Sequence, residues 1–486
     1  MLNPFLLIYP WLCLKPPRKA LQGRTAQHHK LKLAEDRKYR QNKKGDMSGK
    51  TVYARIEQLF EGIRSERIKK AARKSDDLRS WTRKRIMPLY DMLICMLARK
   101  GLSAAMEVRK FFEAAGKTER SVSKQDYLKQ RKKLNPEVFK LLNRDYLKQF
   151  YGGHEAKGWR GYLVLAEDGS RAEIPDSAEN RQTYGENGNQ HGETVTRANI
   201  NILFDVENHF ILDVGIHRVN SSELTEAKEQ IECLKATIGE RKALALFDRN
   251  YGSLEFINFL EEKGVKYIIR LQAGKYKAEV SGMRGNDEWV VLEHTGNRLR
   301  NSSAKRKQEL AEKGHTPVRM VRTGFADEEQ GMLLTNLREG SAGEIQRLYR
   351  KRWKIEQKYH TLKNKMKFES VTGKAGIYVQ QDFWAQMLVF NIVQDLITAA
   401  QRGADKESKK KKYLYRIRIN ENIAIGLFKE QFIRLMVAED DQMKGALFKR
   451  LVADMERYIV PVRELKSSPR KWKRMNKYKC NQKPSF

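Results

Sequence analysis

Apolar residues recur at helical spacing toward both ends of the chain and at strand spacing in its middle. Between residues 52 and 150, apolar side chains such as Ile56 and Leu59 lie three or four positions apart, which predicts helices. From Tyr162 the pattern changes to short apolar runs and alternating runs that are typical of strands. Helical spacing returns from residue 377. The pattern therefore predicts an α/β core between two helical regions.

The predicted core elements follow the order strand, strand, strand, helix, strand, helix, strand. They are a strand at 162–166, a hairpin of strands at 199–206 and 210–216, a helix at 222–238, a strand at 243–247, a helix at 253–263 and a strand at 265–271. This order predicts a mixed sheet with helices on its faces. A Gly-rich, charged stretch then interrupts the pattern before a strand at 332–337 and a long helix that begins at Ala342 or Gly343.

These changes of pattern divide the chain into five predicted regions. They are a poorly ordered basic leader at 1–46, a helical domain at 47–155, an α/β core at 156–271 plus 332–400, a β-rich insertion at 272–331 and a basic helical region at 401–486. The apolar segment at 4–14 is too short to span a bilayer and lacks the features of a signal peptide. Two explanations of the leader stay open: it is disordered, or the chain starts at Met47.

The charge balance points to a polyanionic partner. The 486 residues include 96 Lys and Arg against 60 Asp and Glu, which gives a formal net charge of +36. Nucleic acid is the first candidate for such a chain. The basic segment at 130–133 suits a DNA groove, or equally the surface of a helical bundle, and the runs at 406–412 and 470–479 are either parts of a DNA track or solvated linkers.

Several function classes find no support in the residues. Cys13, Cys95, Cys233 and Cys480 lie far apart, which argues against a zinc site or a disulfide framework and fits a reducing cytoplasm. The sequence has no P-loop, no Rossmann glycine pattern and no Ser-His-Asp arrangement, so neither a nucleotide nor acyl chemistry is expected. No membrane association is expected either.

Two predicted strands lead directly into an aspartate. Asp168 follows the strand at 162–166, and Asp248 follows the strand at 243–247. We expect these strands to be parallel neighbours, which would bring both carboxylates to one edge of the sheet, where open α/β folds form their clefts. Taken singly, each residue has an ordinary explanation: Asp168 as a strand-to-turn residue and Asp248 as a helix N-cap.

A third acid, Glu356, lies in the helix predicted from Ala342 onward. If that helix is continuous, one of its faces carries Tyr349, Arg352, Glu356 and Lys363. A simple ion pair between Glu356 and Arg352 on a solvated helix is the alternative. Together with Asp168 and Asp248, however, Glu356 can complete a carboxylate site, and oxygen ligands favour magnesium or manganese over zinc.

These residues resemble a known family. Tyr-x2-Arg-x3-Glu-x6-Lys, formed by Tyr349, Arg352, Glu356 and Lys363, resembles the YREK signature of bacterial DDE transposases of the insertion-sequence-four type. The segments 168–170 and 248–251 are similar to the first and second acidic motifs, and a strand-rich insertion before the glutamate is typical of the family. The resemblance extends over about residues 120–395.

The resemblance implies a ribonuclease-H-like core in which Asp168, Asp248 and Glu356 are catalytic and bind two Mg²⁺ ions, which Mn²⁺ can replace. It implies that Tyr349, Arg352 and Lys363 bind DNA near the cut. Water would nick one strand at each transposon end, and the freed 3′ hydroxyl would attack a second strand. Some members capture a flipped base with an aromatic residue of the insertion; Trp289 is the candidate here, or else an ordinary core residue of the insertion.

The implied partners are double-stranded DNA, namely terminal inverted repeats and target DNA, and a second copy of the chain when two ends are paired. The implied location is the cytoplasm, at the nucleoid. Two other functions stay open. One is a catalytically silent, transposase-derived repressor or architectural DNA-binding protein. The other is a nuclease on the same fold without specificity for DNA ends.

Overall fold

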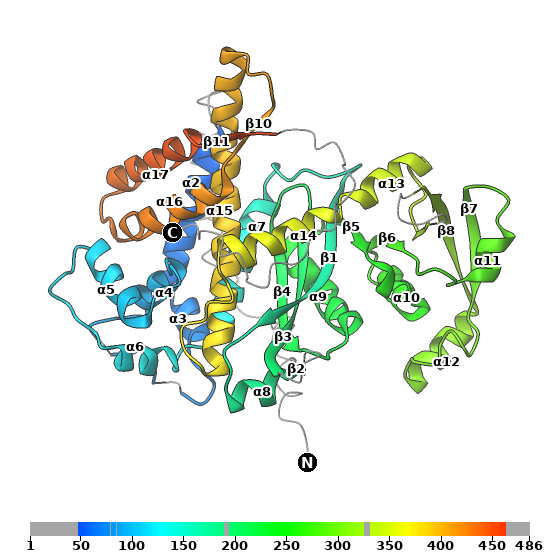
Figure 1. Ribbon diagram of the computed structural model, residues 1–486, viewed down its shortest axis with the longest axis horizontal. Coiled ribbons are helices and arrows are strands. Elements are labelled where there is room, and N and C mark those ends of the chain that lie inside the picture. Colours follow the sequence, from blue (N-terminus) through cyan, green and yellow to red (C-terminus); the bar gives the residue numbers. More distant parts are fainter. Residues whose placement is uncertain (1–46, 78, 84, 189–193, 325–330, 463–486) are drawn as a thin grey trace, which may run out of the picture. The chain divides into compact units, whose positions relative to one another are not determined.

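A nine-stranded mixed sheet lies at the centre of the core (Figure 1). The computed structural model describes residues 47–77, 79–83, 85–188, 194–324 and 331–462. Contacts group the chain from Val52 onward into one compact unit. The leader predicted at 1–46 and the basic run at 470–479 lie outside the described residues.

The sheet confirms the predicted fold class. Its strands are β1 (Tyr162–Glu173), β2 (Glu186–Gly188), β3 (Thr194–Asp205), β4 (Ile211–Arg218), β5 (Lys242–Phe247), β6 (Lys266–Arg270), β7 (Asp287–Glu293), β8 (His315–Thr323) and β9 (Gly331–Thr335). The strand order is β2-β3-β1-β5-β6-β9-β8-β7, and β4 also pairs with β3. β4, β3 and β1 are antiparallel neighbours, whereas β1, β5 and β6 run parallel. This is the ribonuclease-H-like arrangement.

The two strands predicted in the insertion extend the same sheet. β7 pairs with β8, and β8 pairs with β9, which is antiparallel to β6. Two helices, α11 (Lys277–Gly282) and α12 (Ala304–Lys313), lie in the same stretch. The insertion is therefore joined to the core by main-chain hydrogen bonds between strands.

Helices cover both faces of the sheet. Because successive strand side chains alternate between faces, Leu163 and Leu165 of β1 pack in one apolar core and Val164 and Ala166 in another. The first face is covered by α9 (Glu223–Ile238) and α10 (Leu254–Glu262). The opposite face is covered by α13 (Ala342–Arg350), α14 (Trp353–His360) and α15 (Gly376–Lys411).

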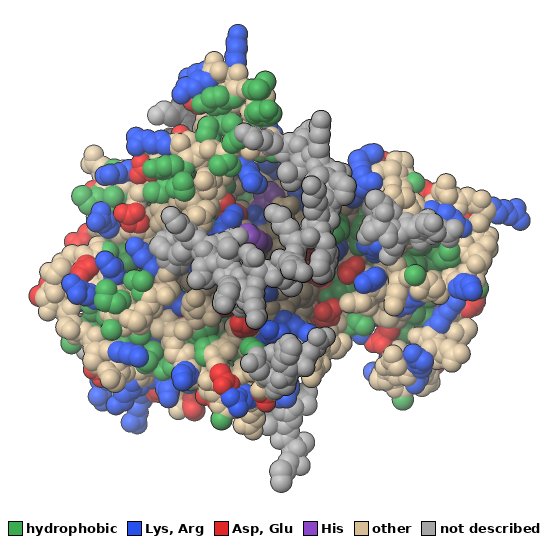
Figure 2. All heavy atoms as spheres, in the orientation of Figure 1, with side chains coloured by type: hydrophobic (Ala, Val, Ile, Leu, Met, Phe, Trp, Pro, Cys, Tyr) green, Lys and Arg blue, Asp and Glu red, His purple; other side chains and the backbone are tan. Residues whose placement is uncertain are grey.

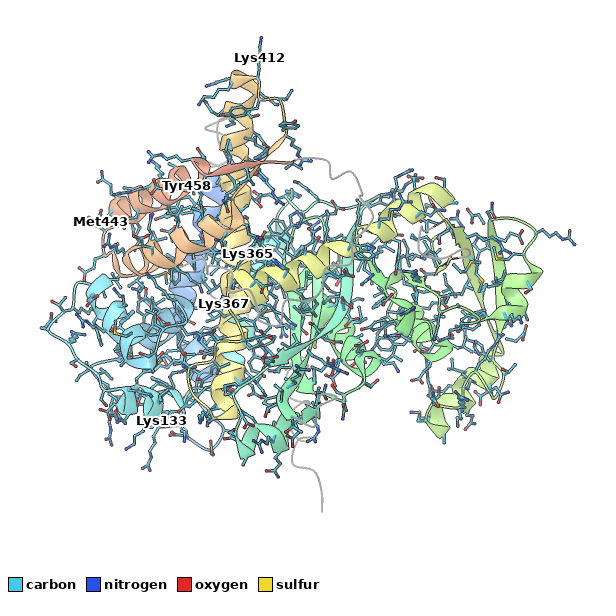
Figure 3. All side chains as sticks on the ribbon, in the orientation of Figure 1. Lys133, Lys365, Lys367, Lys412, Met443 and Tyr458 are labelled. Carbon is cyan, nitrogen blue, oxygen red and sulfur yellow. The ribbon has the colours of Figure 1, made fainter. Side chains whose placement is uncertain are left out.

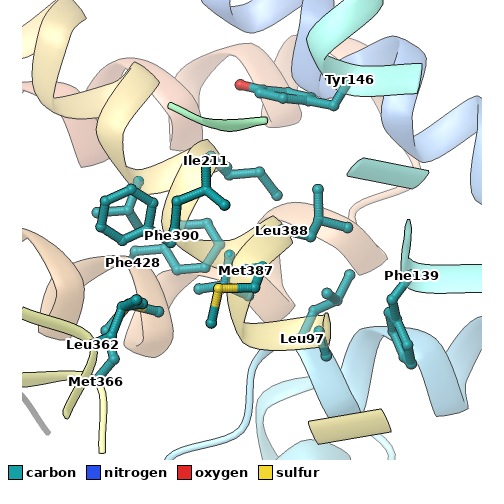
Figure 4. Close-up of a cluster of buried hydrophobic side chains, with 14 of the residues drawn as sticks. Leu97, Phe139, Tyr146, Ile211, Leu362, Met366, Met387, Leu388, Phe390 and Phe428 are labelled. Atoms are coloured by element: carbon teal, nitrogen blue, oxygen red, sulfur yellow. The ribbon is translucent and has the colours of Figure 1, made fainter. Parts of the chain in front are cut away.

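The helices that precede and follow the α/β core in the sequence share one apolar core with α15. They are α2 (Met47–Arg64), α3 (Glu66–Ala71), α4 (Leu89–Leu97), α5 (Ala104–Ala114), α6 (Lys124–Arg131), α7 (Glu137–Gly152), α16 (Glu421–Val437) and α17 (Asp441–Glu456). Figure 4 shows Leu97 and Phe139 on one side of Met387 and Leu388 of α15, and Phe390 of α15 and Phe428 of α16 on the other, all in this core. The short helix α8 (Ala178–Tyr184) and the two-stranded sheet of β10 (Ile417–Ile419) and β11 (Ile459–Pro461) complete the elements.

Three predicted boundaries are wrong. β1 does not end at Asp168 but continues to Glu173, because β3 pairs with it throughout that stretch. The helix predicted from Ala342 is divided into α13 and α14. The basic run at 406–412, for which a solvated linker was one explanation, belongs to the end of α15, which continues through Lys411, since Lys, Glu and Ala are good helix formers.

α15 is also a core helix. By length and hydropathy it could cross a membrane, but 89% of its apolar window is buried inside the structure. Buried polar residues of α15 form hydrogen bonds with residues of the N-terminal helices. Arg131 of α6, which belongs to the segment predicted for a DNA groove, is completely buried and donates to Asp382 of α15 at 2.8 Å.

Candidate active site

Asp168 and Asp248 lie at the same level on neighbouring parallel strands. Ala166 of β1 is in register with Leu246 of β5, and each aspartate is two residues further along its strand direction. Both aspartates also belong to the sheet face that α14 covers, because Val164, Ala166, Leu244 and Leu246 all pack there. The predicted meeting of the two carboxylates at one edge of the sheet agrees with this register.

Glu356 reaches the same face from α14, and Arg352 lies between the acids. The Arg352 guanidinium is 3.1 Å from Glu356 Oε1 and 3.7 Å from Asp168 Oδ2. Glu356 and Asp168 therefore share one buried cation. The structure brings these three predicted residues together, and the ion pair that was the simpler explanation of Glu356 is one part of this arrangement.

α14 is fixed to β1 by Tyr359. Its hydroxyl lies 2.7 Å from the Asp168 carbonyl oxygen and 3.1 Å from that of Ile200 on β3. Ile355, on the same helix, is completely buried against the sheet. Tyr359 was not among the predicted residues, because nothing in its sequence context indicates a contact with a strand almost 200 positions away.

A π-helical turn, η4 (Thr361–Lys365), follows α14. It carries Lys363, which donates to Ser170 Oγ at 2.9 Å and to the Arg171 carbonyl. π-Turns inside helices are frequent at functional sites. The helix is interrupted near Lys351 and again at this turn, so Tyr349, Arg352, Glu356 and Lys363 do not lie on one face of a continuous helix. Lys363 nevertheless lies beside the strand that carries Asp168.

Tyr349 and Arg352 are both buried, with 2% and 6% exposure. Burial raises the pKa of Tyr349 to about 12, so its hydroxyl keeps its proton, and the positive charge of the neighbouring Arg352 opposes the shift. Tyr349 and Arg352 therefore lie together beside the acids.

The environment of Asp168 disfavours the ionised form of its carboxyl group. Burial raises the pKa of Asp168 to about 6; Arg352 opposes this shift, and the carboxylates of Asp248 and Glu356 add to it. Crowded carboxylates with raised pKa values are typical of sites that receive a cation.

The acids fit a divalent cation in chemical type, since all three offer oxygen ligands. Among the described residues, no three His, Cys, Asp or Glu side chains converge closely enough to hold a metal ion as they stand. Arg352 provides the positive charge between Asp168 and Glu356 instead. A cation held by all three acids therefore requires this guanidinium to move away from Glu356.

Glu421, at the first turn of α16, binds α14 and the π-turn that follows it. Its carboxylate oxygens accept hydrogen bonds from α14, η4 and α15: Lys358 at 2.9 Å, Thr361 at 2.8 Å, Lys365 at 2.6 Å and Gln394 at 2.9 Å. Figure 3 shows Lys365 at the meeting of α14 and α16. Burial would raise the pKa of Glu421, but the ammonium groups of Lys358 and Lys365 outweigh it and hold the pKa well below its usual range.

Residues 159–392 match the family described as "Transposase DDE domain". The matched stretch contains Asp168, Asp248 and Glu356. This stretch is similar to transposase DDE domains, and we refer to it as the DDE domain. The predicted family is thus confirmed, and the DDE domain includes every predicted site residue.

The DDE domain has a relative in the same group of elements. Over 250 residues the chain is 25% identical to the transposase InsG for insertion sequence element IS4 from Escherichia coli (strain K12). The match covers 49% of this chain and 52% of that protein, so it spans about half the length of this curated relative. A solved piggyBac transposase synaptic complex with hairpin DNA is 8% identical, with a TM-score of 0.41 over 85% of this chain and 86% of that one.

A second group of acids lies on the opposite face of the DDE domain sheet. Glu167 is completely buried there and accepts from Asn201 at 2.7 Å, and Glu226 of α9 accepts from Asn199 at 3.0 Å. Burial raises the pKa of Glu226 to about 7, although hydrogen bonds from Ser221 and Asn199 oppose the shift.

Glu226→Gln should change how the stability of the DDE domain depends on pH. A carboxyl whose folded-state pKa is raised contributes stability that is complete below pH 4.5 and is lost as the pH rises through about 7. The variant should therefore flatten the pH profile of the free energy of unfolding and be more stable at pH above 7, by about 1 to 3 kcal/mol. Denaturant unfolding at several pH values measures this. Glu232→Gln, at an exposed site on the same helix, is the control, and an unchanged profile for Glu226→Gln would contradict the assignment.

Proposed function

We propose that this chain is a DNA transposase that binds the terminal inverted repeats of its own insertion sequence and cuts and joins DNA strands with divalent metal ions. The observation that supports this most is the placement of Asp168 level with Asp248 on one sheet face, with Glu356 joined to Asp168 through Arg352. The family of the matched domain acts on DNA, which agrees with the net charge of +36.

Asp168, Asp248 and Glu356 would together hold two divalent ions, either Mg²⁺ or Mn²⁺. When bound, the metal activates the attacking hydroxyl and stabilises the leaving oxygen. Water adds to the scissile phosphorus and the 3′ oxygen leaves as a hydroxyl. That hydroxyl then attacks a phosphorus of the opposite or the target strand, and the 3′ oxygen of that strand leaves.

The cationic residues bind the phosphate. Arg352 can exchange Glu356 for a phosphate oxygen, because a guanidinium forms strong paired hydrogen bonds with phosphate as well as with carboxylate. Lys363, on the π-turn beside β1, offers a second positive charge at the same edge. Tyr349 holds Arg352 in place and donates to DNA once the guanidinium has moved.

The regions around the core have separate tasks in this proposal. The helices of 47–155 bind the DNA ends, and two chains pair two ends at the nucleoid. Trp289, which is 49% exposed on β7, is available for a base.

The test is strand cleavage on the chain's own DNA. The full chain, incubated with Mg²⁺ and a duplex that carries the inverted-repeat ends flanking its coding sequence, should leave 3′ hydroxyls at the element ends and join them to a target. Cleavage should stop when the metal is chelated. Tight binding to the ends without any cleavage would instead favour the silent repressor, and cleavage that ignores the ends would favour the nuclease.

Glu421→Gln should slow the reaction without weakening DNA binding. Losing the charge that orders Lys358 and Lys365 frees the helix and π-turn that position Glu356 and Lys363, and small displacements of catalytic groups cost roughly ten- to a hundredfold in rate. We expect kcat to fall and the KM for DNA to stay the same. Glu430→Gln, exposed on the same helix, is the matched control. An unchanged kcat in Glu421→Gln, or an equal loss in both variants, would remove the positioning role.

A further inference from the structure

A basic and aromatic surface lies at the end of α15, far along the chain from the DDE motifs. We name residues 406–418 the basic tip. The segment contains seven Lys or Arg and one Glu, and Lys409 to Lys412 are all exposed. Figure 3 shows Lys412 projecting from the end of the helix, and in Figure 2 Lys and Arg side chains adjoin apolar side chains at this end of the molecule.

The basic tip also exposes apolar side chains that a folded chain normally buries. Tyr413, Leu414 and Tyr415 are 42%, 87% and 47% exposed. Val462, whose amide pairs with the Arg416 carbonyl, is 39% exposed. Single exposed apolar residues are ordinary, but a contiguous group usually marks a surface that binds something.

The tip is held in a defined shape. α15 ends at Lys411, and the next residue, Lys412, has a φ of 49° that turns the chain out of the helix. After the three apolar residues, β10 pairs with β11, and the Val462 amide donates to the Arg416 carbonyl at 2.7 Å. Gln401 of α15 bonds both the Ile417 carbonyl, at 3.1 Å, and the Ile419 amide, at 2.8 Å. The apolar residues are therefore presented on a turn that is braced on both sides.

We propose that the basic tip is a second DNA-binding surface, in which Lys and Arg side chains hold the phosphates and Leu414, between two tyrosines, enters the minor groove and bends the duplex. Charge complementarity selects DNA as the occupant, since four consecutive lysines would repel one another on any partner that is not strongly anionic. Proteins that bend DNA often insert an apolar wedge between base steps while basic residues hold the backbone. This inference rests on the proposed function only in that the chain binds DNA.

Two variants test the two parts of the surface. Replacing Lys409 to Lys412 with alanine should weaken binding to a duplex by on the order of tenfold or more. It should also reduce the slope of log K against log salt by about 0.9 for each phosphate that a lysine no longer neutralises. Leu414→Ser should leave that slope unchanged, weaken binding by roughly tenfold and remove the bend. The bend is measured by energy transfer between dyes at the two ends of the duplex.

Met443→Ser is the matched control, because Met443 is 58% exposed outside the basic tip. It should bind and bend DNA as the unchanged chain does. All three variants keep the catalytic acids, so strand cleavage at DNA ends reports on the proposed function separately. Cleavage with unaltered binding and bending in both tip variants would overturn the proposal while leaving the transposase assignment intact.

Two other binding partners of the basic tip, a second copy of the chain and a lipid surface, would give different results with the same protein variants. If the apolar group pairs two copies of the chain, Leu414→Ser lowers the mass measured by sedimentation without DNA and leaves the bend unchanged. If it binds lipid, the unchanged chain floats with vesicles of anionic phospholipid and Leu414→Ser does not. Either result, with DNA bending unaffected, would overturn the proposal.

Discussion

Asp248→Ala should lower metal-dependent strand cleavage by on the order of a thousandfold or more, because a bound metal contributes several kcal/mol of transition-state stabilisation. Asp248 is level with Asp168 across β1 and β5, so its loss leaves two of the three acids. DNA binding should persist, since no cation is removed. Cleavage of end-labelled inverted-repeat DNA measures the first effect, and a gel-shift titration measures the second.

Asp441→Ala is the matched control for this substitution, because the Asp441 side chain is 81% exposed on α17. It should cleave as the unchanged chain does. Cleavage by Asp248→Ala at the rate of the control would remove Asp248 from the site. Loss of DNA binding together with cleavage would mean that the variant no longer folds, which far-ultraviolet circular dichroism tests directly.

The second large effect is expected at the buried ion pair between Arg131 of α6 and Asp382 of α15. Arg131→Met should lower the free energy of unfolding by up to about 3 to 5 kcal/mol, because the variant breaks the buried 2.8 Å ion pair and leaves Asp382 with only its longer, 3.6 Å contact to Arg99. Arg131 donates to Asp382 Oδ1 at 2.8 Å and to Gln381 Oε1 at 3.1 Å, and Arg131 and Asp382 are almost completely inaccessible to water. Denaturant-induced unfolding of the full chain measures the loss.

An exposed arginine pair provides the comparison for Arg131→Met. Arg109 bonds Glu113 at 2.8 Å on the surface of α5, where the Arg109 side chain is 71% exposed. Arg109→Met should cost no more than about 0.5 kcal/mol. Equal effects for the two substitutions would show that the Arg131–Asp382 pair does not hold α6 on α15.

Many secondary-structure elements of the DDE domain could be predicted from the local pattern of apolar and polar residues. The apolar run at 162–166 and the alternating runs of the β3–β4 hairpin predicted strands because periodicity reports which faces are buried. Asp168 and Asp248 could be assigned to one edge because parallel strands place their carboxyl ends together, and the spacing of Tyr349, Arg352, Glu356 and Lys363 indicated the family. The ends of helices were harder to predict. The break between α13 and α14 near Lys351 is an example, because nothing in the composition of 342–365 disfavours a continuous helix.

By itself, the sequence determined the fold class and predicted the acidic residues of the candidate site and a polyanionic partner, because these depend on side-chain chemistry and on periodicities of a few residues. Only the tertiary structure decided that Arg352 lies between Asp168 and Glu356, that Arg131 is buried on Asp382 and that Glu421 binds α14. The reason is physical. The partners of the buried Arg131 and of Glu421 are separated by tens to hundreds of residues, and long-range packing decides which charged groups lose their water. No local pattern of sequence records that loss.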